Sequence, residues 1–267
     1  RRARSDARRS PHRSRRLAQA FRPEETELLQ RIHHFIQLRW LAVIGVVITT
    51  CVVDQILRIG FPTGPAYGVA LAIAAYNAIF MLWARRLAQG ERAEVVTRAR
   101  RFATLQITVD LLALTVLLHF TGGVENPFFL FFVFHVINAS LLLPVRLTYA
   151  QATLAVVLFG SMAGLEYLGN LPHVELQGFL SAGLYRHGVY VMGVLSAFVV
   201  TLYVAAYMAT SIVRELRHRE AQIVALKDRV TTEAQQLEQA NAKLVEVDRL
   251  KTYFLGMVSH DLKSPLV

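Results

Sequence analysis

The sequence contains very little cysteine and little charge for its length. Cys51 is the only cysteine among 267 residues and lies within an apolar run, so its expected role is packing. This excludes a disulfide framework and a cysteine-rich metal site, and we predict no metal centre. Only 18% of the residues are charged, whereas 54% are hydrophobic. Because this is too apolar for a soluble protein of this size, the sequence predicts a membrane protein.

Glycine and proline are absent from a long stretch, Val194 to Leu255. A helix that starts in the membrane can therefore continue beyond it without a break. Residues 211–250 are predicted to form one helix of a homodimeric coiled coil, because apolar residues alternate there at the four-three spacing of a coiled-coil seam. The apolar seam continues past residue 250 and consists of Ile212, Leu216, Ile223, Leu226, Val230, Leu237, Ala240, Leu244, Val247, Phe254 and Val258.

The formal net charge of +10 comes from basic residues that flank apolar runs. This distribution favours membrane topology over a nucleic-acid-binding face. Residues 1–22 are rich in Arg and Ser, and we predict a disordered basic arm. Residues 23–38 are predicted to form a short amphipathic helix on the membrane surface. Its apolar residues at helical spacing are Leu28, Leu29, Ile32 and Ile36.

Six apolar runs follow, each long enough to cross about 30 Å of hydrocarbon. They are Trp40–Leu57, Ala66–Trp83, Phe102–Phe120, Pro127–Leu143, Leu147–Leu168 and Gly188–Thr210. Arginines gather before the first run, between the second and third, and after the sixth. The positive-inside rule then places both termini on the cytoplasmic side of a bacterial inner membrane. The predicted fold is all-α, with a six-helix transmembrane domain at 39–210 followed by the coiled coil.

The octet Ser259-His260-Asp261-Leu262-Lys263-Ser264-Pro265-Leu266 has the strongest chemical signal in the sequence. A neutral imidazole is a good nucleophile toward a γ-phosphoryl group, but it must lose a proton as the P–N bond forms. The adjacent carboxylate of Asp261 suits an acid–base role beside His260. Pro265 cannot donate a helical hydrogen bond, which predicts a bend just past the nucleophile.

The octet resembles the phosphoacceptor box of sensor histidine kinases. This resemblance implies that His260 is phosphorylated from ATP with Mg²⁺ and passes the phosphoryl group to an aspartate of a response regulator. It also implies that Ser264 positions water for dephosphorylation, and that residues 251–267 begin the dimerisation and phosphoacceptor domain. The sequence does not begin with Met and ends seven residues after His260, so we expect a piece of a longer protein without its ATP-binding domain.

A second motif, Gly122-Gly123-Val124-Glu125-Asn126-Pro127-Phe128, lies between the third and fourth apolar runs. Paired glycines allow close backbone approach and leave N–H groups free. Asn126 offers a donor for a quinone carbonyl, and Phe128 offers a ring face for stacking. The alternative, which carries about equal weight, is a tight turn at the outer face of the membrane.

Together with the Arg39-Trp40-Leu41-Ala42 start of the first run, this motif resembles the RegB-type (PrrB-type) redox-sensing histidine kinases. The resemblance implies that the protein senses the ubiquinone pool through a site at Gly122, Gly123, Asn126, Pro127 and Phe128. The redox-active cysteine of that family lies downstream of the phosphoacceptor histidine, beyond residue 267. Cys51 is in the wrong place to replace it, so the sequence gives no support to a thiol switch.

Asp110 and His135 are ionisable residues inside the third and fourth apolar runs. If these spans are antiparallel neighbours, both residues lie about 12 to 15 Å below the outer face. They are predicted to pair, either to hold the two spans together or to follow protons that accompany quinone reduction. A polar contact within the dimer is a third interpretation. A b-type haem is a less favoured alternative. It is considered because neutral imidazoles are common axial ligands. The histidines in question are His119, His135, His173 and His187.

Three other functions compete with a quinone-responsive kinase. A histidine kinase could respond to a different membrane or envelope signal. A six-span transporter is expected to have helices broken by glycine or proline and related halves, and the sequence shows no such repeat. A transporter also has no use for the octet from Ser259 to Leu266, which therefore favours the kinase over a transporter. A receptor that only scaffolds a partner would carry the octet as a vestige, and the sequence beyond Val267 would decide between this receptor and a kinase.

Overall fold

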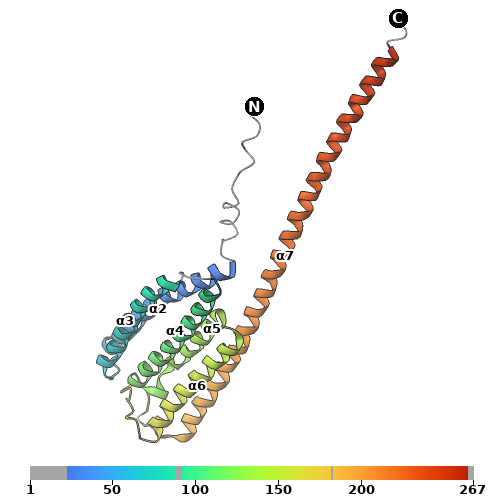
Figure 1. The fold of residues 1–267 in the computed structure, drawn as a ribbon. Coiled ribbons are helices and arrows are strands. Elements are labelled where there is room, and N and C mark those ends of the chain that lie inside the picture. The colour runs from blue at the N-terminus through green and yellow to red at the C-terminus, as the bar shows by residue number, and fades with distance from the viewer. Residues whose placement is uncertain (1–22, 88–91, 182, 264–267) are drawn as a thin grey trace. The chain divides into compact units, whose positions relative to one another are not determined.

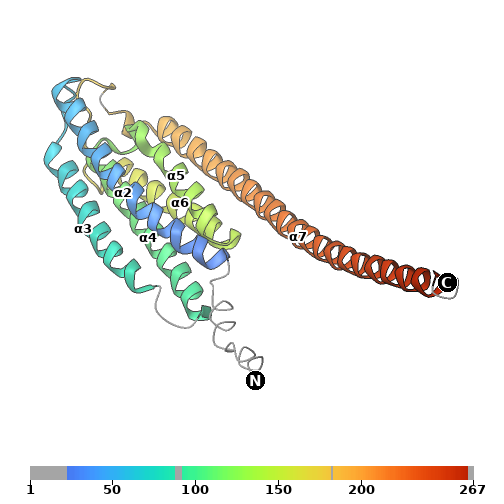
Figure 2. The same cartoon turned by 90° about the horizontal axis from the view of Figure 1, so that it is seen from above.

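The computed structural model describes residues 23–87, 92–181 and 183–263, and the chain divides into two compact units. We call Arg1–Ser211 the membrane unit and Ile212–Val267 the C-terminal unit. The described parts are helical, as Figures 1 and 2 show. The α-helices are α2 (Pro23–Gln55), α3 (Thr63–Leu87), α4 (Arg92–Phe120), α5 (Phe131–Leu142), α6 (Val145–Tyr167) and α7 (Gly188–Lys263).

Five described helices are long and apolar enough to cross a membrane, and they are α2, α3, α4, α6 and α7. A helix satisfies its backbone hydrogen bonds internally, which hydrocarbon requires. The predicted first span extends two residues past the end of α2 and the predicted fifth span one residue past the end of α6, whereas the second, third and sixth fall within α3, α4 and α7. The prediction of an all-helical membrane protein with a long C-terminal helix is confirmed.

The predicted fourth span, Pro127–Leu143, is not one continuous α-helix, and its helical part ends at Leu142. It consists of the 3-10 helix η2 (Pro127–Leu130) followed by α5, which has 12 residues. Pro144 disfavours helical backbone at Leu143, which is extended and ends α5. Because 12 helical residues rise only about 18 Å, α5 alone does not reach across the hydrocarbon core.

The separate surface helix predicted for residues 23–38 is not present. Helix α2 instead runs for 33 residues from Pro23 to Gln55. Ile32 and Ile36 are 1% and 2% exposed and belong to the hydrophobic core. The helical spacing of these residues was predicted correctly, but they face other helices of the protein.

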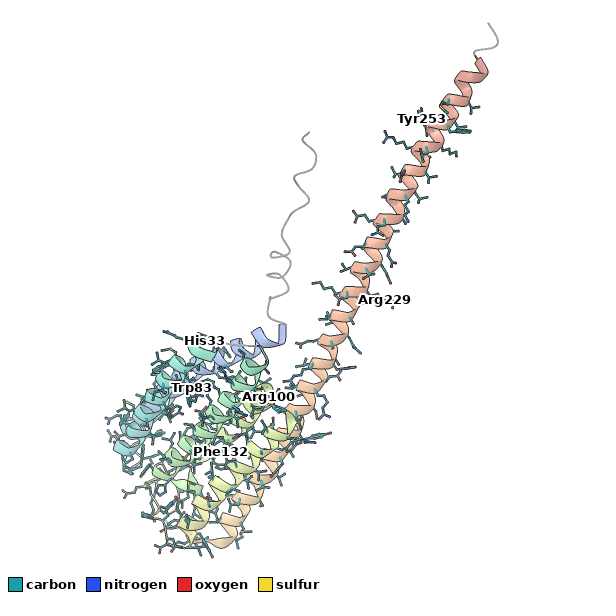
Figure 3. All side chains as sticks on the ribbon, viewed as in Figure 1. His33, Trp83, Arg100, Phe132, Arg229 and Tyr253 are labelled. Carbon is teal, nitrogen blue, oxygen red and sulfur yellow. The ribbon has the colours of Figure 1, made fainter. Side chains whose placement is uncertain are left out.

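Helix α4 forms the centre of the membrane unit, since it contacts α2, α3, α5 and α6 (Figure 2). A group of phenylalanines fills the space between α5, α6 and α7. The ring of Phe159 lies 4.7 Å from that of Phe198, and Phe132, labelled in Figure 3, lies 5.4 Å from Phe198. All three side chains are at most 1% exposed, so they fix the mutual positions of these helices.

Three connecting segments, 56–62, 121–130 and 168–187, meet at one end of the membrane unit, which we call the loop end (Figure 1). The segments that follow α2 and α6 are joined by backbone hydrogen bonds between Gly60 and Gln177, at 3.2 and 3.1 Å. A short 3-10 helix, η1 (Gly123–Glu125), follows α4, and another, η3 (Leu184–Arg186), precedes α7. The loop end therefore has defined tertiary structure.

The C-terminal unit is the part of α7 beyond residue 211. Every described side chain from Arg214 to Val258 is exposed, and Figure 3 shows Arg229 and Tyr253 projecting from the helix. The apolar seam residues are exposed as well, for example Ile223 at 66% and Leu237 at 71%. Within the described chain, this apolar stripe has no partner.

Candidate functional site

The phosphoacceptor residues lie at the end of the longest helix. His260 and Asp261 belong to α7, which continues to Lys263. Their side chains, together with all of Ser264 and Pro265, lie outside the described residues. The roles predicted for His260, Asp261 and Ser264, and the bend predicted at Pro265, therefore stay predictions.

The turn between α4 and α5 depends on its two glycines. Gly122 has a φ of 110° and Gly123 a φ of 51°, a region of backbone space that residues with a Cβ rarely adopt. A Cβ on Gly122 would lie 2.6 Å from Leu176 Cδ1, and a Cβ on Gly123 would collide with the Glu166 carboxylate. The glycines thus bring the turn close to α6 and to the 168–187 segment.

Asn126 holds this turn together. Its amide nitrogen donates to the backbone oxygen and the hydroxyl of Thr121, both at 2.7 Å. Its amide oxygen accepts from the backbone N–H of Phe128 at 2.8 Å and caps η2. Both amide hydrogens are used within the turn, which leaves no donor for a quinone carbonyl. This geometry matches the tight-turn interpretation of Gly122, Gly123 and Asn126.

The other two residues of the predicted quinone site, Pro127 and Phe128, are exposed. Pro127 begins η2 and is exposed, and Phe128 is 39% exposed. The Phe128 ring lies 5.2 Å from that of Phe131 in a tilted arrangement. Phe128 therefore offers an accessible aromatic surface at the loop end.

A buried group of two carboxylates and two histidines lies beneath the turn. We call it the Glu–His cluster, and it consists of His119, Glu125, Glu166 and His173. The Glu166 carboxylate, which is fully buried, contacts His119 Nδ1 at 2.8 Å and His173 Nδ1 at 2.7 Å. His173 Nε2 lies 3.6 Å from Glu125 Oε2. The cluster thereby joins α4, η1, α6 and the 168–187 segment.

The surroundings of His173 favour its protonated form. Burial by itself lowers the pKa of His173, but the hydrogen bond and negative charge of Glu166 and the charge of Glu125 raise it. The net effect is a pKa above the ordinary value of histidine. The Tyr185 ring stacks on the imidazole at 4.0 Å, and an aromatic face also favours a cation.

A second buried network lies deeper in the membrane unit. Arg39 makes two hydrogen bonds to the Asp110 carboxylate, at 2.8 and 2.7 Å, and a third to Asn77 at 2.8 Å. The Tyr76 hydroxyl donates to Asp110 at 2.7 Å. This network links α2, α3 and α4.

The predicted pair between Asp110 and His135 is wrong for this chain. Asp110 is engaged by Arg39 and Tyr76, whereas His135 Nδ1 lies 3.0 Å from the carbonyl oxygen of Phe131 on its own helix. The bidentate geometry of a guanidinium explains the preference, because it satisfies both carboxylate oxygens at once.

The histidines also do not form a haem site of the kind considered above. His119 and His173 bind the two oxygens of one carboxylate, which leaves no room for a porphyrin between their rings. His187 is exposed. Among the residues that the structure describes, no group of three or more His, Cys, Asp or Glu side chains is arranged to hold a metal ion.

Comparison with known families identifies the membrane unit. A family model described as a PilS-like transmembrane domain matches residues 22–223, which is more than half of the chain. The chain belongs to the PilS-like transmembrane domain family. PilS-like domains are found in membrane sensor kinases, so the match fits the membrane region of a sensor histidine kinase. No curated protein and no solved structure matches the chain.

Sequence reasoning missed most of the polar residues that organise this PilS-like domain. Arg39, Glu125 and Glu166 received no role of their own, although each lies in or beside an apolar run. An ionisable residue in such a run needs a partner, and that signal was available. The partner of each residue comes from another helix or loop, and the sequence alone does not identify it.

We predict that Asp110→Asn destabilises the PilS-like domain by about 3–5 kcal/mol, because it leaves the buried Arg39 guanidinium without its counter-charge. The double variant Arg39→Gln/Asp110→Asn should lose less than the sum of the two single changes, since it removes both charges. Thermal unfolding in detergent measures each loss. The control is His135→Gln, which should cost little. The account of this network is wrong if His135→Gln destabilises the protein as much as Asp110→Asn.

Proposed function

We propose that the chain is the sensor and phosphoacceptor part of a membrane histidine kinase. His260 accepts the γ-phosphoryl group of ATP, which is bound with Mg²⁺, and Asp261 accepts the proton that the imidazole releases. The phosphoryl group then passes to an aspartate on a response regulator. The observation that carries this proposal is α7, a single helix that begins in the PilS-like domain at Gly188 and includes His260.

The working form in this proposal is a homodimer. The four-three repeat of apolar residues is exposed along a single helix, and two such helices can bury it as a coiled coil. Each buried Val, Leu or Ile contributes about 1.5–3 kcal/mol relative to exposure. Arg219, Glu233 and Lys251 also fall on the seam, where polar residues lower stability and fix the register.

The proposed topology has six crossings of a bacterial inner membrane, with both termini in the cytoplasm. Helix η2 and α5 together run from Pro127 to Leu142 and rise about 26 Å, close to the hydrocarbon thickness. Arg85, near the end of α3, and Arg98, Arg100 and Arg101, in the first part of α4, lie toward the helix ends opposite the loop end. The positive-inside rule then makes the loop end the outer one.

A transporter is less well supported by the geometry. Each of the five long apolar helices is continuous within the described residues, although α2, α3, α6 and α7 contain internal glycines. Transporters instead bind substrates where helices are broken near the middle of the membrane. A scaffold without catalytic function would tolerate loss of His260.

The direct test is labelling of the full-length protein with radioactive ATP in nanodiscs. His260→Gln should abolish the label, because the amide is not a nucleophile toward phosphate. His218→Gln is the matched control, since His218 is exposed on the same helix and should be dispensable. Full labelling of His260→Gln would contradict the proposal.

A membrane quinone is a second proposal and concerns the signal. The observation in its favour is the exposed Phe128 ring at the loop end, as the resemblance to RegB-type kinases implies. The engaged amide of Asn126 argues against a hydrogen bond from that residue. A quinone held by stacking on Phe128 is the form that agrees with both observations.

If this second proposal is right, labelling of His260 should differ between nanodiscs that contain oxidised and reduced ubiquinone. Phe128→Ala should remove that difference. Phe134→Ala should preserve it, because Phe134 is an exposed ring on α5 outside the turn. Equal labelling of the wild type under both redox conditions rules out the quinone and leaves the kinase proposal intact.

A further inference from the structure

The Glu–His cluster lies directly before the helix that includes His260. The backbone N–H of Tyr185 in η3 donates to Glu125 Oε1 at 3.0 Å, and α7 begins three residues later at Gly188. His173 is on the same connecting segment and binds Glu166 of α6. Two separate contacts therefore fix the segment between α6 and α7, and both involve members of the cluster.

The charge of the cluster depends on its protons. Glu125 and Glu166 are 6% and 0% exposed, and two ionised carboxylates at this burial require positive partners. Among the residues that the structure describes, the ion-pair partners of both carboxylates are histidines. Histidine is the side chain that ordinarily gains and loses its charge near neutral pH. With both carboxylates ionised, a proton on His173 brings the cluster closer to neutrality.

The geometry at His173 agrees with this requirement. Its Nδ1 faces Glu166, while Nε2 is buried and has no hydrogen-bond partner among the described residues. Glu125 Oε2 lies 3.6 Å from this nitrogen. In a neutral ring that donates from Nδ1, the Nε2 lone pair would face a carboxylate. In the protonated ring, the Nε2–H points toward the Glu125 carboxylate, and the imidazolium forms an ion pair with it.

Groups from every neighbouring element face the His173 imidazole or its partners. Helix α4 contributes His119, η1 contributes Glu125, α6 contributes Glu166, and η3 contributes Tyr185. From α7, Tyr190 faces Glu125. Two of these groups are acidic and one is a second histidine, so the surroundings favour uptake of a proton by His173.

We propose that the Glu–His cluster is a proton-controlled latch that holds the 168–187 segment, and with it the first turn of α7, against η1 and α6. Its function would be to make the kinase respond to the pH at the loop end, and this regulatory role rests on the proposed function. The latch is closed while His173 is protonated. It weakens as pH rises through the elevated pKa of His173, because the neutral ring no longer balances Glu125.

The test uses the full-length protein in sealed proteoliposomes, with ATP added outside so that only molecules whose C-terminal part faces outward are labelled. The internal pH is varied from about 5.5 to about 8.5, a range that spans the titration of histidine, while the external pH is fixed. We expect wild-type labelling of His260 to change by about fivefold or more across this range, a typical allosteric coupling. Glu166→Gln should remove the dependence.

Glu175→Gln is the matched control, because Glu175 is an exposed acid on the same segment outside the cluster. It should retain the wild-type response. If labelling of wild-type His260 does not change with internal pH, the latch proposal is wrong, but the kinase proposal is unaffected. A pH response that persists unchanged in Glu166→Gln would also overturn it.

A second measurement does not depend on kinase activity. In the same full-length protein labelled with ¹⁵N-histidine, His173→Gln identifies the His173 signal. We expect His173 to lose its proton at a higher pH than exposed His187, and Glu166→Gln to remove this difference. If no labelling of His260 occurs at any pH, the proposed function fails. The titration of His173 is then the test of the latch proposal. Identical titration of His173 and His187 would overturn it.

Discussion

Hydrocarbon cannot solvate a charge or an unpaired polar group, and this constraint determines how the membrane unit is built. Each ionisable side chain among the helices must find its partner inside the protein. Arg39 forms an ion pair with Asp110, and Glu166 contacts His119 and His173. Because lipid chains are as apolar as the side chains, the hydrophobic effect gives little driving force between membrane helices, and these polar contacts together with close side-chain packing specify which helices lie together.

The two polar networks hold different parts of the unit. Arg39, Asn77 and Asp110 join the first three helices, α2 to α4. The Glu–His cluster joins α4 to α6 and to the segment that leads into α7. Helix α4 takes part in both networks, which agrees with its central position.

The sequence predicted features that depend on local patterns. Long apolar runs identified five membrane helices, and the lack of glycine and proline from Val194 to Leu255 predicted the continuity of α7. Features that depend on tertiary contacts were missed or wrong. Asp110 was assigned to His135 because both lie at similar predicted depth, yet a guanidinium on α2 satisfies the carboxylate better. Asn126 was seen as a ligand donor, but its amide closes the turn that contains it.

The central proposal is that α7 pairs with α7 of a second copy in a parallel coiled coil that leads to His260. Disulfide cross-linking of single cysteines placed in turn from Ile212 to Val258 tests it directly, in the full-length protein in native membranes with Cys51 replaced by Ser. The account predicts cross-linking maxima at the apolar seam positions, repeating about every 3.5 residues. A flat profile, or maxima on the opposite face of the helix, would contradict it.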